Sequence, residues 1–450
     1  MNSNIELKKL LFVLQLEGYD NSRFLNWIKL NKPTDIKEGK KTLQWTYKVK
    51  MIYLLANLLN NVSFKKSPQK CLFWVNSILK FPEYIFIQIV ILLAKIKIRI
   101  HRKLIVIGIT GSYGKTSTKE ILNHLLKAKY EVIKTPESYN TVLGVCKVIL
   151  KSLNQQHQVF IVEMGAYKKG DIKALCDLVK PKIGIITSIG KQHLERFGSL
   201  EKIVETKFEL LDVLPNNGQA FINKEDKNLS QKAQGYTQDK LSYFSFEEIN
   251  INRKILRINN IISDINGTTF KITDNKNQKE TIITPYLGKN NILNTLAAIS
   301  VSYYLGISLS EIAKQCPTLS PIPHRMQIIK GINGTTIIDD AFNSNPDSFK
   351  SAIETVRNLP AKRKIIITPG VVELGDLQYE ENRLLGKLVA EVFDYSIIVG
   401  ETNRKALEEE AVQGKSTSVK NLEEATKKLE EIVVPGTVIL FENDLPDQYI

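Results

Sequence analysis

The most constraining feature of this 450-residue chain is the stretch VIGITGSYGKTSTKEIL at residues 106–122. Its apolar residues end near Thr110 as a buried strand would, and a helical pattern begins near Lys115. Gly111 and Gly114 allow the intervening turn backbone angles that a side chain would forbid. The N–H groups of such a turn converge at the N-terminus of the helix, where phosphate binds well. The segment therefore predicts a nucleotide-phosphate loop that follows a parallel strand.

Two side chains of this loop carry the expected chemistry. Lys115 offers a cation for the outer phosphates, and Thr116 offers a hydroxyl for Mg²⁺. The strict phosphate-loop pattern has glycine where this chain has Ile109, so the loop is a variant. The alternative is a chance Gly-Lys-Thr at a helix start, and the strand that precedes it argues against that alternative.

A second group of polar residues follows the neighbouring strands. Glu163 comes at the end of the run FIVE, and His193 follows the run IGIITSIG. Because the carboxyl ends of parallel strands share one edge of a sheet, we expect Thr116, Glu163 and His193 to converge on one metal–phosphate site. Oxygen ligands suit Mg²⁺, and a histidine is tolerated beside them. The alternative for His193 is a loop histidine with only structural hydrogen bonds.

The positive charge is concentrated at one end of the chain. The whole chain carries a formal net charge of +15, and residues 1–103 hold 19 Lys+Arg against 6 Asp+Glu. The rest is close to neutral, which argues against nucleic acid as a binding partner and indicates one basic module.

The same module is unusually apolar. Its longest uncharged apolar stretch, residues 84–94, has 11 residues, whereas a membrane-spanning helix needs about 20. Two interpretations stay open for residues 1–103. One is a small helical domain with a buried helix, and the other is an interfacial segment that docks on anionic lipid.

The remaining pattern predicts an α/β protein with three domains. From residue 104, short β-rich runs alternate with helical patterns, which is typical of a parallel sheet. Residues 240–285 are typical of an antiparallel insert, and a second, Rossmann-like α/β series follows residue 323. We expect a basic, mainly helical module at 1–103, a central ATP-binding domain at 104–322 and a C-terminal domain at 323–450. Four scattered cysteines without C-x-x-C spacing, and an N-terminus without a secretory pattern, predict a cytoplasmic protein.

Several motifs together resemble the Mur ligases, which are ATP-dependent amide-bond-forming enzymes of cell-wall synthesis. The resemblance covers about residues 104–447. It is most similar to the members that add D-alanyl-D-alanine to a muramoyl tripeptide, through STKE, HLERFGSLE, DDAFNSNPDS and VELGD. The other segments that carry it are SYNTVLGV, the long block EMGAYKKGDIKALCDLVKPKIGIITSIGKQHLERFGSLEKIVETKFELL, LGKNNILNTLAAISVSYYLGI, PIPHRMQ, IIDDAFNSNPDSFKSAI and ITPGVVELGD.

The resemblance implies a reaction, its cofactors and its partners. ATP phosphorylates a peptide carboxylate, and an amine then attacks the acyl phosphate without any protein nucleophile. The cofactors are ATP and two Mg²⁺ ions, and Lys207 matches a lysine that many members carbamylate. The substrates are a muramoyl-peptide precursor, UDP- or lipid-linked, and D-Ala-D-Ala. We expect a monomer in the cytoplasm, peripheral at the inner face of the membrane.

The resemblance also implies roles for individual residues. Asn291 and Asn294 lie one helical turn apart and share a face, which matches the adenine side of the family's site. Arg325 and Asp340 lie beyond the predicted domain boundary, so contact with the nucleotide would require the domains to close. The implied catalytic residues are Lys115, Glu163, His193, Lys207 and Arg325, and the implied metal ligands are Thr116, Glu163, His193 and Lys207. The implied nucleotide-binding residues are Gly111, Ser112, Tyr113, Gly114, Lys115, Thr116, Ser117, Asn291, Asn294, Arg325 and Asp340. The implied substrate-binding residues are Asn140, Thr141, Asn343 and Asn345.

The chain departs from the family pattern in three places. His324 replaces a glycine, Asn290 replaces a histidine, and the basic module 1–103 replaces the domain that grips the UDP-sugar. The last departure suggests a lipid-linked acyl substrate at the membrane face.

Three alternative functions fit the sequence less well. A folylpolyglutamate or cyanophycin-type ligase is disfavoured by the motifs DDAFNSNPDS and VELGD. A P-loop NTPase without ligase activity leaves the C-terminal motifs unexplained. An inactive scaffold is disfavoured by the intact phosphate-loop and metal residues.

Overall fold

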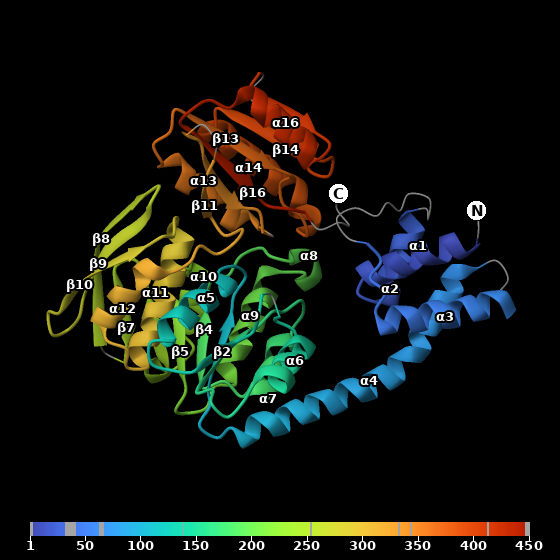
Figure 1. Ribbon diagram of the computed structural model, residues 1–450, viewed down its shortest axis with the longest axis horizontal. Helices are drawn as coiled ribbons and strands as arrows, with labels where there is room; N and C mark the ends of the chain where they lie inside the picture. Colours follow the sequence, from blue (N-terminus) through green and yellow to red (C-terminus); the bar gives the residue numbers. More distant parts are fainter. Residues whose placement is uncertain are drawn as a thin grey trace. The chain divides into compact units, whose positions relative to one another are not determined.

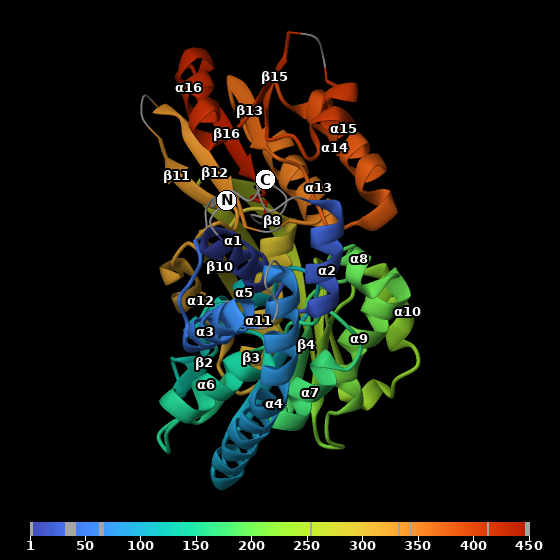
Figure 2. The same cartoon turned by 90° about the vertical axis from the view of Figure 1, so that its right-hand side faces the viewer.

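The computed structural model describes residues 3–31, 42–62, 67–137, 139–252, 254–331, 334–342, 344–411 and 414–445. The chain divides into two compact units. The first ends at Leu92 and the second runs from Leu93 to Leu445. Figures 1 and 2 show the elements of both units in two views.

The first unit is a small helical domain with its own core. That core forms where the apolar faces of its helices meet. Helix α1 contributes more of its buried residues than any other helix, Phe24 of α2 is its largest member, and α3 and the start of α4 complete it. The predicted mainly helical module is therefore present. The helices are α1 (Ser3–Leu16), α2 (Asn21–Leu30), α3 (Tyr47–Val62) and α4 (Pro68–Ile100), whose residues from Leu93 onward belong to the second unit.

Helix α4 is 33 residues long and continues through Pro82. The apolar stretch 84–94 lies inside it with most of its large side chains exposed, Tyr84 at 60% and Phe86 at 65%. The interpretation of this stretch as a buried helix is therefore wrong. Taken as a whole, α4 is long and apolar enough to cross a membrane, but its longest uncharged apolar stretch has only 11 residues.

The second unit contains a ten-stranded sheet in the order β10-β9-β8-β7-β6-β5-β4-β1-β3-β2. The strands from β2 to β6 pair in parallel, and those from β6 to β10 pair antiparallel. This confirms the predicted antiparallel insert in a parallel sheet. The strands are β1 (Ile105–Thr110), β2 (Val132–Lys134), β3 (Val159–Glu163), β4 (Ile183–Ile186), β5 (Gln219–Asn223), β6 (Leu241–Phe244), β7 (Glu248–Ile251), β8 (Lys254–Asp264), β9 (Gly267–Thr273) and β10 (Lys279–Thr284).

Helices cover both faces of this sheet. On one face α5 and α11 pack together, and Ile107 and Ile109 of β1 join their core. On the other face Gly108 lies against Leu210 of α9. The helices are α5 (Lys115–Leu126), α6 (Val142–Ser152), α7 (Asp171–Val179), α8 (Leu194–Phe197), α9 (Leu200–Asp212), α10 (Lys227–Ala233), α11 (Lys289–Tyr304) and α12 (Leu309–Gln315).

A second sheet of six strands follows, in the order β11-β12-β16-β13-β14-β15. Only its edge strand β11 is antiparallel, which is the expected Rossmann-like arrangement. The domain boundary near residue 323 stays a prediction. The elements are β11 (Gln327–Lys330), β12 (Thr336–Asp340), α13 (Pro346–Arg357), β13 (Arg363–Thr368), α14 (Gln378–Val392), β14 (Tyr395–Val399), α15 (Arg404–Glu409), β15 (Ser416–Val419), α16 (Leu422–Ile432) and β16 (Thr437–Glu442).

Candidate active site

The phosphate loop has the predicted form, between the end of β1 at Thr110 and the start of α5 at Lys115. Its two glycines have positive φ angles, +149° at Gly111 and +81° at Gly114. A Cβ atom at Gly111 would lie 2.0 Å from Thr187 Oγ1, and one at Gly114 would lie 2.3 Å from Asn294 Oδ1. Both positions therefore need glycine for conformation and for space.

The loop that follows β4 holds the phosphate loop in place. Ser112 N donates to Ser188 O at 2.8 Å, and Ser112 Oγ donates to Gly190 O at 3.1 Å. Tyr113 N donates to Ser188 Oγ at 3.2 Å. The side chain of Ser112 thus fixes the loop, while Ser117 lines a small cavity beside it.

Lys115 lies at the centre of the loop. Its Nζ donates to Gly111 O at 2.7 Å and to Ser112 O at 3.2 Å. Burial lowers the pKa of Lys115 to about 8, although the nearby Glu163 carboxylate opposes that shift. The cation is therefore held inside the turn where phosphate oxygens are expected.

Glu163 is the hub of the polar network at the end of β3. Its Oε2 accepts from Lys119 Nζ at 2.9 Å and from Thr116 Oγ1 at 3.0 Å, and its Oε1 accepts from Asn140 Nδ2 at 3.2 Å. Burial by itself raises the pKa of Glu163, but the charges of Lys119 and Lys115 outweigh that effect and lower it. Glu163 is therefore ionised in the folded protein.

Lys119 was missed in the sequence. It is fully buried and pairs with Glu163. Its position four residues after Lys115, on the same face of α5, was the available signal.

Thr116 and Glu163 suit a magnesium ion. Mg²⁺ prefers oxygen ligands and usually takes one or two carboxylates together with substrate phosphates and water. No group of three or more His, Cys, Asp or Glu side chains able to hold a metal is found in the described part of the chain. The two oxygen-bearing side chains thus fit an ion that substrate phosphates help to hold.

His193 has a hydrogen-bond partner other than Thr116 and Glu163. Its Nδ1 forms a short hydrogen bond with the Glu373 carboxylate, and its ring packs against Tyr167 at 4.8 Å between centroids. Among the described residues, no hydrogen bond links His193 to the other two. The hydrogen bonds therefore join Thr116 to Glu163 and His193 to Glu373, and the convergence of all three residues on one metal–phosphate site stays a prediction.

Lys207 lies inside α9 with 3% of its surface exposed. Burial, and then the charge of Lys115, lower the pKa of Lys207 to about 7. A substantial fraction of this amine is therefore neutral near neutral pH.

The predicted nucleotide residues of the C-terminal side come together with the loop. Asn294 Nδ2 donates to Asn291 Oδ1 at 3.4 Å, and Asn291 Nδ2 donates to Arg325 O at 3.4 Å. The Arg325 guanidinium stacks on Phe342 at 4.2 Å. A cavity of about 50 Å³ is lined by Gly114, Ser117, Asn291, Asn294, Arg325 and Asp340, among others.

Asp340 ends β12 beside a second buried carboxyl group. Its Oδ1 accepts from Met326 N at 3.0 Å. Burial raises the pKa of Asp340 to about 6, against the lowering effect of the Arg325 charge. Burial, and then the Asp340 charge, raise the pKa of Glu442 well above its usual value. Glu442 was not predicted, because only the pairing of β12 with β16 brings it here.

The predicted substrate residues divide into two groups. Asn140 belongs to the site through Glu163. Thr141 caps α6 by accepting from Gly144 N at 3.3 Å. Asn345 caps α13 by accepting from Asp347 N and Ser348 N, each at 3.0 Å. Asn343 lies outside the described residues.

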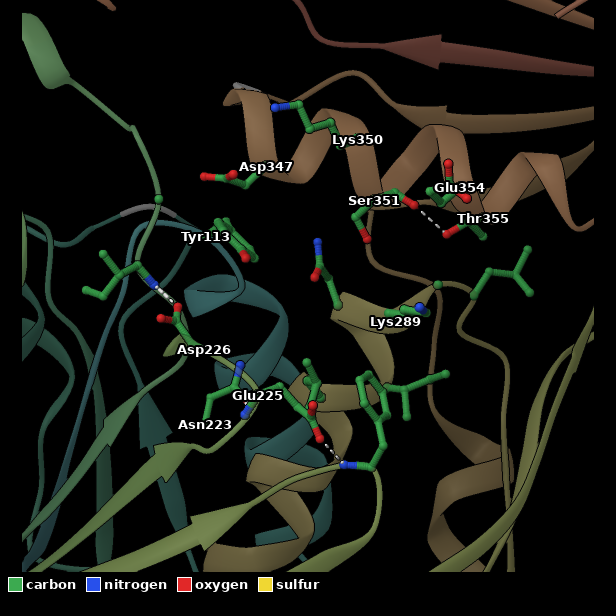
Figure 3. A pocket seen from close by; sticks show the side chains of 18 of the residues that line it. Tyr113, Asn223, Glu225, Asp226, Lys289, Asp347, Lys350, Ser351, Glu354 and Thr355 are labelled. Atoms are coloured by element: carbon green, nitrogen blue, oxygen red, sulfur yellow. Dashed lines mark hydrogen bonds between the residues drawn. The ribbon is translucent and has the colours of Figure 1, made fainter. Parts of the chain in front are cut away.

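A cavity of about 770 Å³ adjoins the loop. Figure 3 shows Tyr113 and Asp226 on one side and residues of α13, including Asp347 and Ser351, on the other. Asp226 Oδ2 accepts from Ile189 N at 2.6 Å, which joins the loop after β4 to the start of α10. The volume of this cavity is within the range of pockets that bind small molecules.

Glu373 was also missed in the sequence. Its carboxylate binds His193 and accepts from Arg196 Nη2 at 3.1 Å. Burial alone would raise the pKa of Glu373, but the hydrogen bond and charge of His193, with the Arg196 charge, lower it. Glu373 comes from the loop after β13, so this contact links the second sheet to the loop after β4.

Comparison with known proteins identifies the class that this fold and site define. The Mur ligase middle domain matches residues 109–302, and the domain described as "Mur ligase, glutamate ligase domain" matches residues 324–442. The chain belongs to the Mur ligase family, a class of ATP-dependent ligases.

Relatives of this chain within the family carry the same enzyme name. The UDP-N-acetylmuramoyl-tripeptide–D-alanyl-D-alanine ligase of Bacillus subtilis (strain 168) is 32% identical over 346 residues, which cover 75% of this chain and 72% of the relative. The structure of MurF from Acinetobacter baumannii has a TM-score of 0.71 at 25% identity, covering 79% of this chain and 76% of that one. MurF ligase from Thermotoga maritima in complex with ADP has a TM-score of 0.70 at 27% identity, covering 80% of each chain.

Proposed function

We propose that this chain is an ATP-dependent, ADP-forming ligase that adds D-alanyl-D-alanine to the carboxylate of a muramoyl tripeptide in peptidoglycan precursor synthesis. The observation that carries the proposal is the grouping of the phosphate loop with Glu163 at one edge of the large sheet. The names of the relatives support the choice of substrates.

The residues of the site act by positioning and by charge. The loop N–H groups and Lys115 hold the ATP phosphates, and Arg325 adds a second cation from the C-terminal side. Asn291, Asn294 and Asp340 hold the nucleoside. Thr116 and Glu163 would hold Mg²⁺, which neutralises phosphate charge when bound.

The test is phosphate release from ATP and Mg²⁺, with UDP-MurNAc-tripeptide and D-Ala-D-Ala each omitted in turn. The proposal expects release only when both are present. It expects Lys115→Ala to be inactive and the exposed Lys173→Ala to be fully active. Release without an acceptor would contradict a ligase and favour a P-loop NTPase. Release only with a lipid-linked tripeptide would keep the chemistry and change the carrier.

We also propose that Lys207 is carbamylated and helps to hold a second Mg²⁺ near His193. The neutral amine attacks CO₂, a new N–C bond forms, and one proton leaves to give a carbamate anion. A buried lysine whose pKa is about 7 supports this step, since the neutral amine is the reactive form.

Carbamylation is tested by ¹³C NMR with ¹³C-bicarbonate. A carbamate signal in the wild-type protein that Lys207→Arg lacks is expected, together with bicarbonate activation that grows as pH rises through about 7. No such signal at pH 8 would contradict the proposal. We further propose that the enzyme is monomeric and cytoplasmic, which size-exclusion chromatography with light scattering and cell fractionation would test.

A further inference from the structure

Helix α4 presents a stripe of large apolar side chains that nothing in the described chain covers. The members recur every three or four residues, which places them on one face of an α-helix over five turns. Their exposed fractions reach 65% at Ile78 and 72% at Phe81. The stripe, named here the α4 stripe, consists of Trp74, Ile78, Phe81, Ile85, Ile89 and Leu92.

The opposite face of α4 is different. Glu83, the only acidic residue of the helix, lies on that face and pairs with Lys48 of α3, with 2.6 Å between Nζ and Oε1. Further along the same face, Ala94 is fully buried, and Lys97 Nζ donates to Leu150 O of α6 at 2.9 Å. The helix thus has a back that contacts the protein and a front that is apolar and free of acidic charge.

Basic residues follow the front at its C-terminal end. Lys95 and Arg99 lie on the side of the helix that carries the stripe, whereas Lys80 and Lys97 lie toward the opposite face. They belong to the segment 1–103 that has 19 basic and 6 acidic residues. A long apolar stripe with aromatic members and basic residues at one end matches an anionic lipid interface.

We propose that the α4 stripe is a membrane-docking surface, which lies in the plane of an anionic bilayer with its apolar side chains at the boundary between headgroups and acyl chains. This inference does not depend on the proposed ligase activity.

Two other occupants fit the observations less well. A spanning helix would need about 30 Å of apolar length, but the 14 residues between Lys80 and Lys95 span only about 21 Å. Lys97, which belongs to the second unit, also donates to Leu150 O of α6 within that unit, so the C-terminal end of the helix packs on protein. A second copy of the chain would bring two strongly basic modules together, and their like charges oppose such a contact.

The test is flotation of the full-length protein with two kinds of vesicle. One is pure phosphatidylcholine, and the other contains about 30% phosphatidylglycerol, which gives the vesicle a negative surface potential. Binding to the anionic vesicles that weakens with salt is expected. The double variant Phe81→Gln/Ile85→Gln should lower the vesicle affinity about 100-fold, because two large apolar side chains leave the interface. The double variant Lys95→Gln/Arg99→Gln should lower it about 30-fold.

The matched control is Ile262→Gln/Ile283→Gln, which replaces two exposed isoleucines of the ten-stranded sheet. It should bind vesicles like the wild type. All variants should keep the wild-type circular dichroism and the wild-type rate of phosphate release with soluble substrates.

Several outcomes would overturn the proposal. Equal binding to neutral and anionic vesicles would show that charge does not contribute. Wild-type binding by Phe81→Gln/Ile85→Gln would show that the stripe does not contact the bilayer. Retention in the membrane after alkaline carbonate would show a spanning helix. A dimer in solution that the stripe variant dissociates, with no vesicle binding, would show that a second copy covers the stripe.

Discussion

Lys119 Nζ lies 2.9 Å from Glu163 Oε2, and both side chains are buried. This ion pair lies directly behind the phosphate loop, where Glu163 also accepts from Thr116. Lys119 therefore keeps Glu163 ionised and oriented toward the place where a magnesium ion and phosphates would meet.

Replacing Lys119 with methionine should destabilise the protein. A buried carboxylate that loses its partner costs about 3–5 kcal/mol. The pKa of Glu163 is now held below its usual 4.5, so its contribution is present above that pH and is lost as pH falls through the folded value. In Lys119→Met that pKa rises, and acid unfolding should begin at a higher pH. Urea unfolding and an acid titration followed by circular dichroism measure both effects.

Lys134→Met is the matched control for Lys119→Met, because its ion pair with Glu120 is partly exposed. It should cost less than about 1 kcal/mol. Equal losses for the two variants would contradict a special role for the Lys119–Glu163 pair.

A methyl group at Gly114 should abolish nucleotide binding. Its Cβ would lie 2.3 Å from Asn294 Oδ1, so either the loop or α11 must move. Because a displacement of about 1 Å can cost about 100-fold, ATP affinity should fall at least that much in Gly114→Ala. Gly170→Ala is a sharp control, since Gly170 has φ +94° but nothing within 4 Å of its would-be Cβ. Gly170→Ala should keep ATP affinity in calorimetry, and an equal loss in both variants would show a general loss of structure instead of a collision at the loop.

Glu373→Gln should slow the reaction while the fold persists. The glutamine keeps the shape but loses the negative charge that orients His193 and Arg196. Replacing a residue that orients a functional side chain typically lowers activity by about 10- to 100-fold. We expect at least a tenfold lower kcat and a higher Mg²⁺ concentration for half-maximal rate. Glu195→Gln, an exposed neighbour, should match the wild type, and a changed KM for ATP alone would contradict this role for Glu373.

The sequence predicted what depends on local pattern. The strand, the glycine turn and the start of α5 at Lys115 follow from one continuous motif, and the alternation after residue 104 predicted the sheets. Lys119 was within reach because helical spacing alone puts it beside Lys115.

Other features depend on contacts between distant segments. Glu373 meets His193 across 180 residues. It lies in the motif VELGD, but that motif does not indicate which residue its carboxylate contacts. The sequence placed His193 after the strand β4, but its hydrogen bond with Glu373 determines where the imidazole ring lies. Pro82 lies inside α4, although proline usually ends or kinks a helix, so the continuity of that helix depends on more than local preference.

Glu442→Gln should stabilise the protein at alkaline pH. Asp340 and Glu442 are both buried carboxyl groups, and their folded pKa values are raised, that of Asp340 to about 6. A raised folded pKa of an acid means that its stabilising contribution is full at low pH and is lost as pH rises through the folded value. The substituted glutamine would be neutral at every pH, and its amide oxygen would still accept from Ser344 Oγ, which now lies 2.7 Å from Glu442 Oε1. We therefore expect a gain on the order of 1–3 kcal/mol in the free energy of unfolding at pH 8, and little change at pH 5. Urea unfolding at the two pH values measures the difference, with the exposed Glu423→Gln as the control. A variant that is equally destabilised at both pH values would show that Glu442 acts as an ionised partner of Arg325 instead.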